Sequence, residues 1–396
     1  MASVVFYFQV HQPFRLRRYS IFDSDTGYFD NVHNEQICRK VAEKCYRPAN
    51  ARILALIRRH EGRFRASYSL TGTIIEQFRR WAPDVLDSFR ALADTGCVEF
   101  IAETFYHSLA FLYSREEFAA QTEMHRRFME ELFGQKPRVF RNTELTYNND
   151  VARFVEDMGF DAILTEGADH VLGYRSPTFL YNPPNCARLR MLMKNYRLSD
   201  DIAFRFGNRA WKEWPLTAER FTQWVDQING NGYVCNLFMD YETFGEHQWS
   251  DTGIFEFLRA LPDKVFATGK NDFLTVSQAI DRYPSVGEMD VPHMISWADT
   301  ERDISAWLGN SMQANALHDL YAMADEILDS GDEALIRDWR QLQTSDHFYY
   351  MCTKWFADGD VHKYFNPYGS PYDAYINYMN ILDNVRSRVA LARSQA

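Results

Sequence analysis

Seven short apolar runs alternate with helical patterns through the first two-thirds of the chain. Such runs are typical of parallel strands buried on both faces, because a strand with one solvated face alternates apolar and polar residues. Repeated strand–helix units imply a parallel sheet, either closed as a barrel or doubly wound. The runs are residues 3–10, 63–70, 98–103, 138–143, 160–166, 189–195 and 233–240.

The doubly wound alternative usually carries glycine-rich phosphate-binding motifs. No GxGxxG follows the first run and no GxxxxGK[ST] occurs in the sequence, so we expect a barrel. The segments between the runs support strand–helix units. In EEFAAQTEMHRRFMEELFG, residues 116–134, apolar side chains recur at helical spacing and Gly134 predicts the end of the helix.

After about residue 305 the pattern becomes helical only. One apolar stripe predicts a helix, and a second helix is predicted near the C-terminus with Ser370 as cap and Pro371 in the first turn. We therefore expect an α/β catalytic barrel over residues 1–305 and a helical domain over 306–396 that packs on it and completes the active-site cleft. The stripes are Leu317, Leu320, Ala324, Ile327 and Leu328, then Ala374, Tyr375, Tyr378, Ile381, Leu382, Val385 and Val389.

Charge and composition exclude several classes of partner. A formal net charge of -11 argues against nucleic acid, which needs clustered Lys and Arg. No apolar run approaches membrane-spanning length, so no membrane partner is expected. Six cysteines without ligand-like spacing, and a first segment unlike a secretory signal, favour a cytoplasmic enzyme. The 30 Phe, 22 Tyr and 9 Trp residues suit carbohydrate, although most rings would fill the core equally well. The sequence leaves the oligomeric state open.

Acidic residues that directly follow the predicted strands are the candidates for chemistry, because catalytic groups of α/β barrels lie at strand ends. Glu144 follows an apolar strand, and no Lys or Arg occurs in the next eight residues. Asp240 ends another strand, in a segment with three acidic residues, one histidine and neither Lys nor Arg. Uncompensated carboxylates at such places are costly unless they have a task. Strand-end residues His11 and Glu99 suit loop ordering or helix capping about as well as substrate binding.

Two carboxylates on different strand ends are what glycoside hydrolysis requires. One must be ionised to attack or stabilise the anomeric carbon, while the other must be protonated to release the leaving oxygen. The separation of the two groups, about 5 to 5.5 Å or about 6.5 to 9.5 Å, decides between retention and inversion. The sequence does not fix that separation.

Five ordered motifs resemble glycoside hydrolase family 57, and within it the intracellular α-amylase-like branch. The resemblance covers most of the chain and implies a (β/α)7 barrel followed by helices, a retaining mechanism and α-glucan or maltooligosaccharide substrates. The motifs are HQP at 11–13, GCVEFIAE at 96–103, FRNTEL at 140–145, MDYETFGEHQW at 239–249 and SWADTERDISAWLGNSMQ at 296–313.

The same resemblance implies roles for individual residues. Glu144 matches the nucleophile and Asp240 the general acid and base. Neither a metal nor a cofactor is expected. Positions that match sugar-binding motif residues are His11, Glu99, Glu242, His247, Trp249, Trp297 and Asp299.

The reaction expected from these residues is hydrolysis of α-1,4-glucans by double displacement. A 4-α-glucanotransferase or branching enzyme of the same family is the nearest alternative, because only the acceptor of the second step differs. A metal-dependent polysaccharide deacetylase using His11 and Asp240 is less favoured, since no HxxxH or HExxH motif occurs. A non-catalytic glucan-binding protein is disfavoured by the presence of both carboxylates. Glycogen and maltodextrin are the expected polymers, while α-1,4 against α-1,6 action and chain-length preference stay open.

Overall fold

The seven predicted runs form the seven parallel strands of a barrel in a computed structural model, which describes residues 1–354 and 366–395. All seven predictions are confirmed, with ends that differ by a few residues. The strands are β1 (Ala2–Val10), β2 (Ala66–Leu70), β3 (Val98–Phe100), β4 (Val139–Arg141), β5 (Ala162–Thr165), β7 (Arg190–Met193) and β8 (Val234–Asp240).

Backbone hydrogen bonds join these strands into a ring. One sheet runs β3-β2-β1-β8 and the other contains β7-β5-β4, all with parallel neighbours. Ala102, just beyond β3, exchanges backbone hydrogen bonds with Val139 and Arg141 of β4. Asn195, just beyond β7, donates to the carbonyl of Asn236 in β8. These contacts connect the two sheets at both edges.

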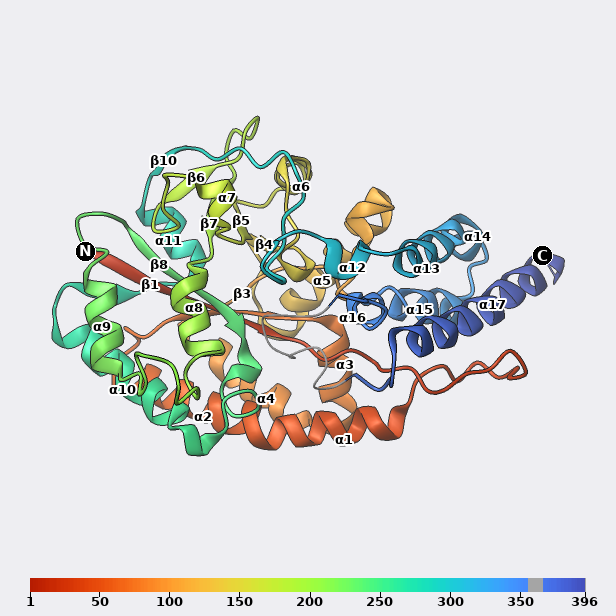
Figure 1. Cartoon of the computed structure of the whole chain (residues 1–396), viewed down its shortest axis with the longest axis horizontal. Helices are drawn as coiled ribbons and strands as arrows, with labels where there is room; N and C mark the ends of the chain where they lie inside the picture. Colours follow the sequence, from red (N-terminus) through yellow and green to blue (C-terminus); the bar gives the residue numbers. More distant parts are fainter. Residues whose placement is uncertain (355–365, 396) are drawn as a thin grey trace.

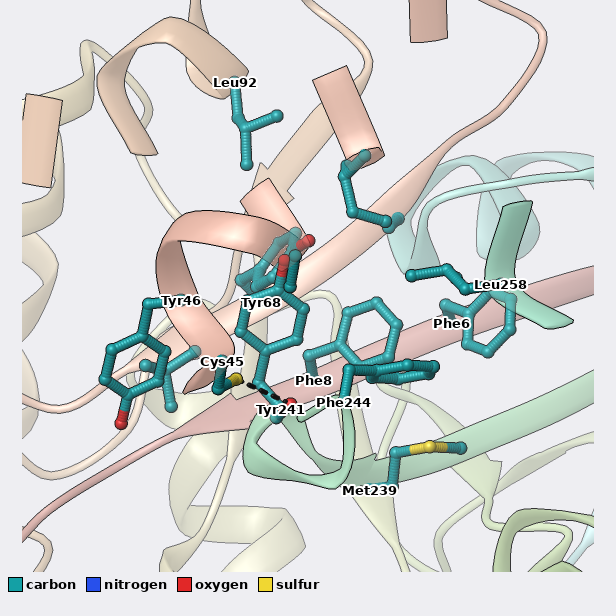
Figure 2. Packing of buried hydrophobic residues seen from close by; sticks show 14 of the residues in the cluster. Phe6, Phe8, Cys45, Tyr46, Tyr68, Leu92, Met239, Tyr241, Phe244 and Leu258 are labelled. Atoms are coloured by element: carbon teal, nitrogen blue, oxygen red, sulfur yellow. Dashed lines mark hydrogen bonds between the residues drawn. The ribbon is translucent and has the colours of Figure 1, made fainter. Parts of the chain in front are cut away.

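Alternation along β1 shows how the barrel is filled. Val5 and Tyr7 point inward and share a cluster with inward-facing residues of the other strands, and the Tyr7 ring packs on Phe238 of the neighbouring strand β8. Phe6 and Phe8 point outward and pack beneath the surrounding helices, in the cluster drawn in Figure 2. Since successive side chains of a strand lie on opposite faces, a run that is apolar throughout requires both faces to be buried. The continuous apolar pattern therefore reflects the barrel directly.

Helices follow most strands and cover the barrel. The long predicted helix is confirmed as α5, with Ser114 capping its first turn and Gly134 in the left-handed conformation at its end. The helices before residue 300 are α1 (Asn31–Val41), the π-helix η1 (Ala42–Tyr46), α2 (Arg47–Arg59), α3 (Gly72–Trp81), α4 (Pro83–Ala93), α5 (Arg115–Phe133), α6 (Asn149–Asp157), α7 (Asp169–Leu172), α8 (Tyr196–Ala203), α9 (Ala218–Asp226), α10 (Ile254–Ala267) and α11 (Val276–Arg282), with short 3₁₀ turns at Ala110–Leu112, Thr143–Leu145, Tyr241–Thr243 and Ser250–Thr252.

The C-terminal helices extend from one end of the barrel (Figure 1). They share one hydrophobic cluster with outward-facing residues of the barrel, including Phe140 and Met191. The first predicted stripe is divided at Met323, and Leu328 is exposed rather than buried. The second stripe is confirmed, with the Ser370 hydroxyl accepting from the Asp373 N–H. The helices are α12 (Ser305–Leu308), α13 (Ser311–Ala322), α14 (Ala324–Asp329), α15 (Glu333–Gln341), α16 (Ser345–Tyr349) and α17 (Pro371–Gln395).

Three further short strands were not predicted. They are β6 (Leu180–Asn182), β9 (Asn271–Phe273) and β10 (Ser285–Glu288). Each spans only three or four residues, and β10 is largely exposed, so none has the apolar run that marks the barrel strands. Across residues 1–354 and 366–395, no helix combines the length and the hydropathy needed to cross a lipid bilayer.

Candidate active site

A pocket lies where the carboxyl ends of the barrel strands meet the C-terminal helices. It brings together six of the residues expected from sequence: His11, Glu144, Asp240, Glu242, His247 and Trp297. In α/β barrels this face carries the chemistry, because several strand ends converge there. The full lining is Gln9, His11, Gln12, Pro13, Arg15, His107, Glu144, Asp240, Glu242, His247, Trp297, Asp346 and Tyr350.

The backbone around Glu144 is strained. Glu144 and Leu145 both have positive φ, 58° and 52°, which non-glycine residues adopt only at a cost of about 1–3 kcal/mol each. The neighbouring Asn142 side chain holds the turn, since its amide donates to the Thr146 carbonyl at 3.0 Å and to the Thr146 hydroxyl at 2.9 Å. This turn directs a buried carboxylate, only 2% exposed, into the pocket.

Three side chains from distant parts of the chain hold the Glu144 carboxylate. The Trp297 indole N–H donates to Oε2 at 2.8 Å. The Ser345 hydroxyl donates to Oε1 at 3.0 Å, and His107 Nε2 lies 3.2 Å from the same oxygen. Donors on both oxygens favour the ionised carboxylate. The contacts also fix the orientation of the carboxylate, as an attacking nucleophile requires.

His107 bridges two buried carboxylates. Its Nδ1 lies 2.9 Å from Glu103 Oε2, and Arg141 lies 3.7 Å from the same oxygen of Glu103. Burial opposes charge on the imidazole, but hydrogen bonds to Glu103 and Glu144 raise the pKa of His107 to about 9. Burial likewise opposes charge on Glu103, yet His107 and Arg141 lower its pKa to about 2. His107 is therefore an imidazolium at neutral pH, and its charge supports ionised Glu144.

This buried pair predicts a bell-shaped contribution to stability. The pKa of Glu103 is lowered by folding, so its contribution is present above about pH 4.5 and is lost as the pH falls toward 2. The pKa of His107 is raised, so its contribution is complete below about pH 6.5 and is lost as the pH rises through 9. Glu103→Gln should cost about 3 kcal/mol or more at pH 6, measured by urea unfolding. The cost should shrink at pH 3 and pH 10, and a cost independent of pH would contradict the ion pair.

Asp240 and Glu242 occupy the opposite side of the pocket, at the end of β8. Asp240 is opposite Gln9 in the register between β8 and β1. Burial and the nearby Asp240 raise the pKa of Glu242 to about 8. A proton is thus available on this side at neutral pH, while Glu144 on the other side is surrounded by donors. Such divergent environments separate an acid from a nucleophile.

His11 connects the barrel to the C-terminal helices. Its Nε2 lies 2.9 Å from Asp346 Oδ2, its Nδ1 lies 2.9 Å from the Thr71 hydroxyl, and its ring stacks on His107 with centroids 4.0 Å apart. Ligand atoms of His11, His107 and Asp346 lie within 4.8 Å of one another, close enough in principle to share a metal ion. Both nitrogens of each ring are already engaged in hydrogen bonds, and His107 is cationic. These hydrogen bonds hold the two rings against Thr71, Asp346 and the buried carboxylates of Glu103 and Glu144.

Three residues expected in the site lie outside the pocket lining. The Glu99 carboxylate accepts from the Ser67 hydroxyl at 3.0 Å and from the Ser277 N–H at 3.1 Å. It fastens β3 to β2 and to the start of α11. Trp249 is exposed, with the Lys44 ammonium 5.0 Å from the centre of its ring. Asp299 lies two residues beyond Trp297 at a position with φ of 55°.

Sequence reasoning missed the residues that come from α16. Asp346 and Tyr350 line the pocket and Ser345 bonds to Glu144, but the segment SDHFYY is in a purely helical region. Sequence reasoning also gave no role to Glu103, the last residue of the predicted strand 98–103, or to His107 four residues later. The only indication in the sequence that they form a pair is an acid and a histidine four residues apart.

The comparisons with known proteins agree with this geometry. Residues 5–292 match the model of Glycosyl hydrolase family 57. A Methanocaldococcus jannaschii protein named "Putative alpha-amylase" is 44% identical over 393 residues, covering 96% of this chain and 83% of its own length.

Solved structures show the same fold at low identity. A 4-alpha-glucanotransferase from Thermococcus litoralis superposes with a TM-score of 0.71 at 13% identity, over 98% of this chain and 60% of its own. A GH57-type branching enzyme from Pyrococcus horikoshii gives 0.70 at 16% identity, over 97% of this chain and 88% of its own. Sequence match, barrel and paired carboxylates lead to one conclusion: the chain belongs to glycosyl hydrolase family 57.

Proposed function

We propose that the chain is a retaining hydrolase of α-1,4-glucans that acts by double displacement, with Glu144 as nucleophile and Asp240 as general acid and base. The observation that carries the proposal is the asymmetry of the pocket. Glu144 accepts from Trp297, Ser345 and cationic His107, whereas Asp240 lies beside Glu242, whose pKa is raised by burial and by Asp240, so this pair of carboxyls holds a proton at neutral pH. Enzymes of the family retain the anomeric configuration, and a relative that is 44% identical to this chain is named "Putative alpha-amylase".

In the first step, Asp240 gives its proton to the glycosidic oxygen while Glu144 attacks the anomeric carbon. The bond from that carbon to the leaving sugar breaks as the bond to a Glu144 oxygen forms. In the second step, Asp240 removes a proton from water, and the water oxygen displaces Glu144. Two inversions at the same carbon give net retention, and both carboxyls return to their starting protonation states.

We further propose that residues 306–396 form a helical domain that completes the cleft, with the boundary near 305. Asp346 and Tyr350 in the pocket lining, and the Ser345 bond to Glu144, support this proposal. A cytoplasmic location is also proposed, supported by cysteines that remain free thiols among the described residues. The remaining expected subsite residues, His11, His247 and Trp297, are proposed to contact the sugar from the pocket wall.

Maltoheptaose separates hydrolysis from transfer. Wild-type protein should release only shorter chains, and proton NMR during the first turnovers should show new reducing ends in the α configuration. Longer chains, detected by mass spectrometry or chromatography, would assign the chain to the 4-α-glucanotransferase type, and new α-1,6 branch signals would assign it to the branching type. New ends in the β configuration would contradict retention. Binding of maltoheptaose without turnover would contradict the enzymatic assignment.

A further inference from the structure

The π-helix η1 packs against the loop that follows the general acid. It interrupts the helical segment from Asn31 to Arg59 over Ala42–Tyr46. The Cys45 thiol donates to the Tyr241 carbonyl at 3.2 Å, as drawn in Figure 2, and the Tyr46 hydroxyl donates to Glu242. Single π-turns within α-helices occur frequently at functional sites. Here the consecutive residues Cys45 and Tyr46 of the π-turn contact Tyr241 and Glu242, the two residues that follow Asp240.

Close packing fixes this contact. Gly245 has φ of 114°, and a Cβ there would lie 2.0 Å from the Lys44 carbonyl of η1. Lys40 Nζ and Lys44 Nζ lie 3.0 Å and 3.6 Å from the buried carboxylate of Glu246. The loop after β8 therefore has little freedom to move away from η1. The Tyr46 hydroxyl is held against Glu242 by this arrangement.

The carboxyl of Glu242 is surrounded by donors. Besides the Tyr46 hydroxyl, the backbone N–H groups of Glu242 and His11 donate to it. Burial and the charge of Asp240 raise its pKa to about 8, and the three donors act in the opposite direction. Donors stabilise an ionised carboxylate. They therefore offset part of the effect of burial and stabilise the state in which Glu242 carries the negative charge.

We propose that Tyr46 is a positioning residue that acts through Glu242 to keep the proton of the Asp240–Glu242 pair on Asp240. This inference rests on the proposed role of Asp240 as general acid. Two coupled carboxyls that hold one proton have two arrangements, and only the one with the proton on Asp240 is active. The Tyr46 hydroxyl stabilises that arrangement, because it donates to the partner that is then ionised.

The other titratable groups near this pair do not replace Tyr46. Burial raises the pKa values of Cys45, Tyr46 and Tyr241 well above their ordinary values, so these groups stay neutral below pH 8. Burial and His107 lower the pKa of His11. His247 lines the same pocket and is present in the wild type and in every variant of Tyr46. The remaining charged or titratable neighbours are Cys38, Lys40, Lys44, Tyr68 and Glu246.

Tyr46→Phe tests the proposal by its pH profile. Loss of a hydrogen bond to a charged group should lower kcat/KM on maltoheptaose about tenfold at pH 7. The loss should shrink toward acid pH, where a second proton binds to the pair, so the optimum should shift to acid by about one pH unit. The matched control is Tyr241→Phe, which removes a buried phenol hydroxyl that donates to Asn50 at 2.8 Å instead. The control should keep the wild-type shape of the profile.

A second variant guards against a purely structural effect. Glutamine at position 242 carries neither a charge nor a titrating proton, so in a Glu242→Gln background Tyr46→Phe should add no further shift. An equal loss at every pH, or the same shift in Tyr241→Phe, would overturn the role of Tyr46. Failure of the wild type to turn over maltoheptaose would instead overturn the proposed function. Thermal unfolding of each variant shows whether the fold is kept.

Discussion

Glu144→Gln is expected to lower kcat on maltoheptaose by at least about 10⁴-fold while the protein remains folded. Glutamine has nearly the shape of glutamate, so the contacts with Trp297 and Ser345 can be largely kept. The amide is not a nucleophile toward the anomeric carbon, so the glycosyl-enzyme does not form. Steady-state kinetics measures the loss, and circular dichroism with thermal unfolding confirms the fold.

Glu99→Gln is the matched control for this experiment. Glu99 is a partly buried glutamate within barrel strand β3, and it binds Ser67 and Ser277 instead of lining the pocket as Glu144 does. Its substitution should lower stability and leave kcat within about threefold of wild type, as is usual for residues that touch neither substrate nor nucleophile. If Glu99→Gln abolished turnover and Glu144→Gln did not, the assignment of the nucleophile would be wrong.

Azide rescue distinguishes loss of the nucleophile from loss of the general acid. In Glu144→Gly the space of the lost carboxylate admits azide, which attacks the anomeric carbon of an activated α-maltosyl fluoride once. A single displacement gives a β-configured glycosyl azide. Detection of this product by NMR would identify Glu144 as the nucleophile from the reaction product as well as from the loss of turnover. An α-configured azide from this variant would contradict the assignment.

The barrel could be predicted because each of its strands is buried on both faces. Residues such as Phe6 and Tyr7 are apolar on opposite faces of β1, and this leaves a continuous signal in the sequence. The short strands β9 and β10 leave no such signal, since polar Asn271 and Asp272 and the exposed Val286 interrupt the pattern. Their pairing depends on neighbours brought by the closed barrel rather than on their own residues.

The sequence does not show how far along the barrel axis each candidate side chain lies. Glu99 and Glu103 belong to one motif and differ by four residues, about 13 Å along an extended strand. Glu103 reaches His107, which lines the pocket, whereas Glu99 is bound lower down by Ser277. The motif alone does not distinguish them. Only the three-dimensional end of the strand distinguishes them.

Contributions from the far end of the chain could not be predicted either. Ser345 and Asp346 bind Glu144 and His11 across more than 200 residues of sequence. Within their own segment they look like polar positions of a helix, because a long-range contact leaves no local periodicity. The unusual backbone of His107, with φ of 54°, has the same origin. The surrounding contacts impose it.

The carboxylates on the two sides of the pocket lie in opposite electrostatic environments. On one side, cationic His107 and the indole N–H of Trp297 contact the Glu144 carboxylate and favour its negative charge. On the other, buried Glu242 provides a second carboxyl that competes for negative charge with Asp240. Substitutions on the first side should therefore affect attack on the anomeric carbon. Substitutions on the second side should affect proton transfer to the leaving oxygen.

Asp240→Ala is expected to lower kcat on maltoheptaose by about 10³- to 10⁴-fold, the upper range for loss of a general acid. The loss should depend on the leaving group, because only a poor leaving group needs a proton. An aryl α-maltoside with an acidic phenol should still form the glycosyl-enzyme through Glu144, giving a burst of phenol, followed by slow hydrolysis without a base. Stopped-flow absorbance measures the burst.

Azide should accelerate the second step of Asp240→Ala, since this anion attacks the glycosyl-enzyme without a general base. The product should be an α-configured glycosyl azide after two inversions, opposite to the product of Glu144→Gly. Asp299→Ala is the control, because Asp299 lies outside the pocket lining and its variant should respond to neither leaving group nor azide. Equal losses on maltoheptaose and on the aryl substrate would show that Asp240 is not the acid. Because the two azide products have opposite configurations, the pair of variants assigns both roles independently of any effect on folding.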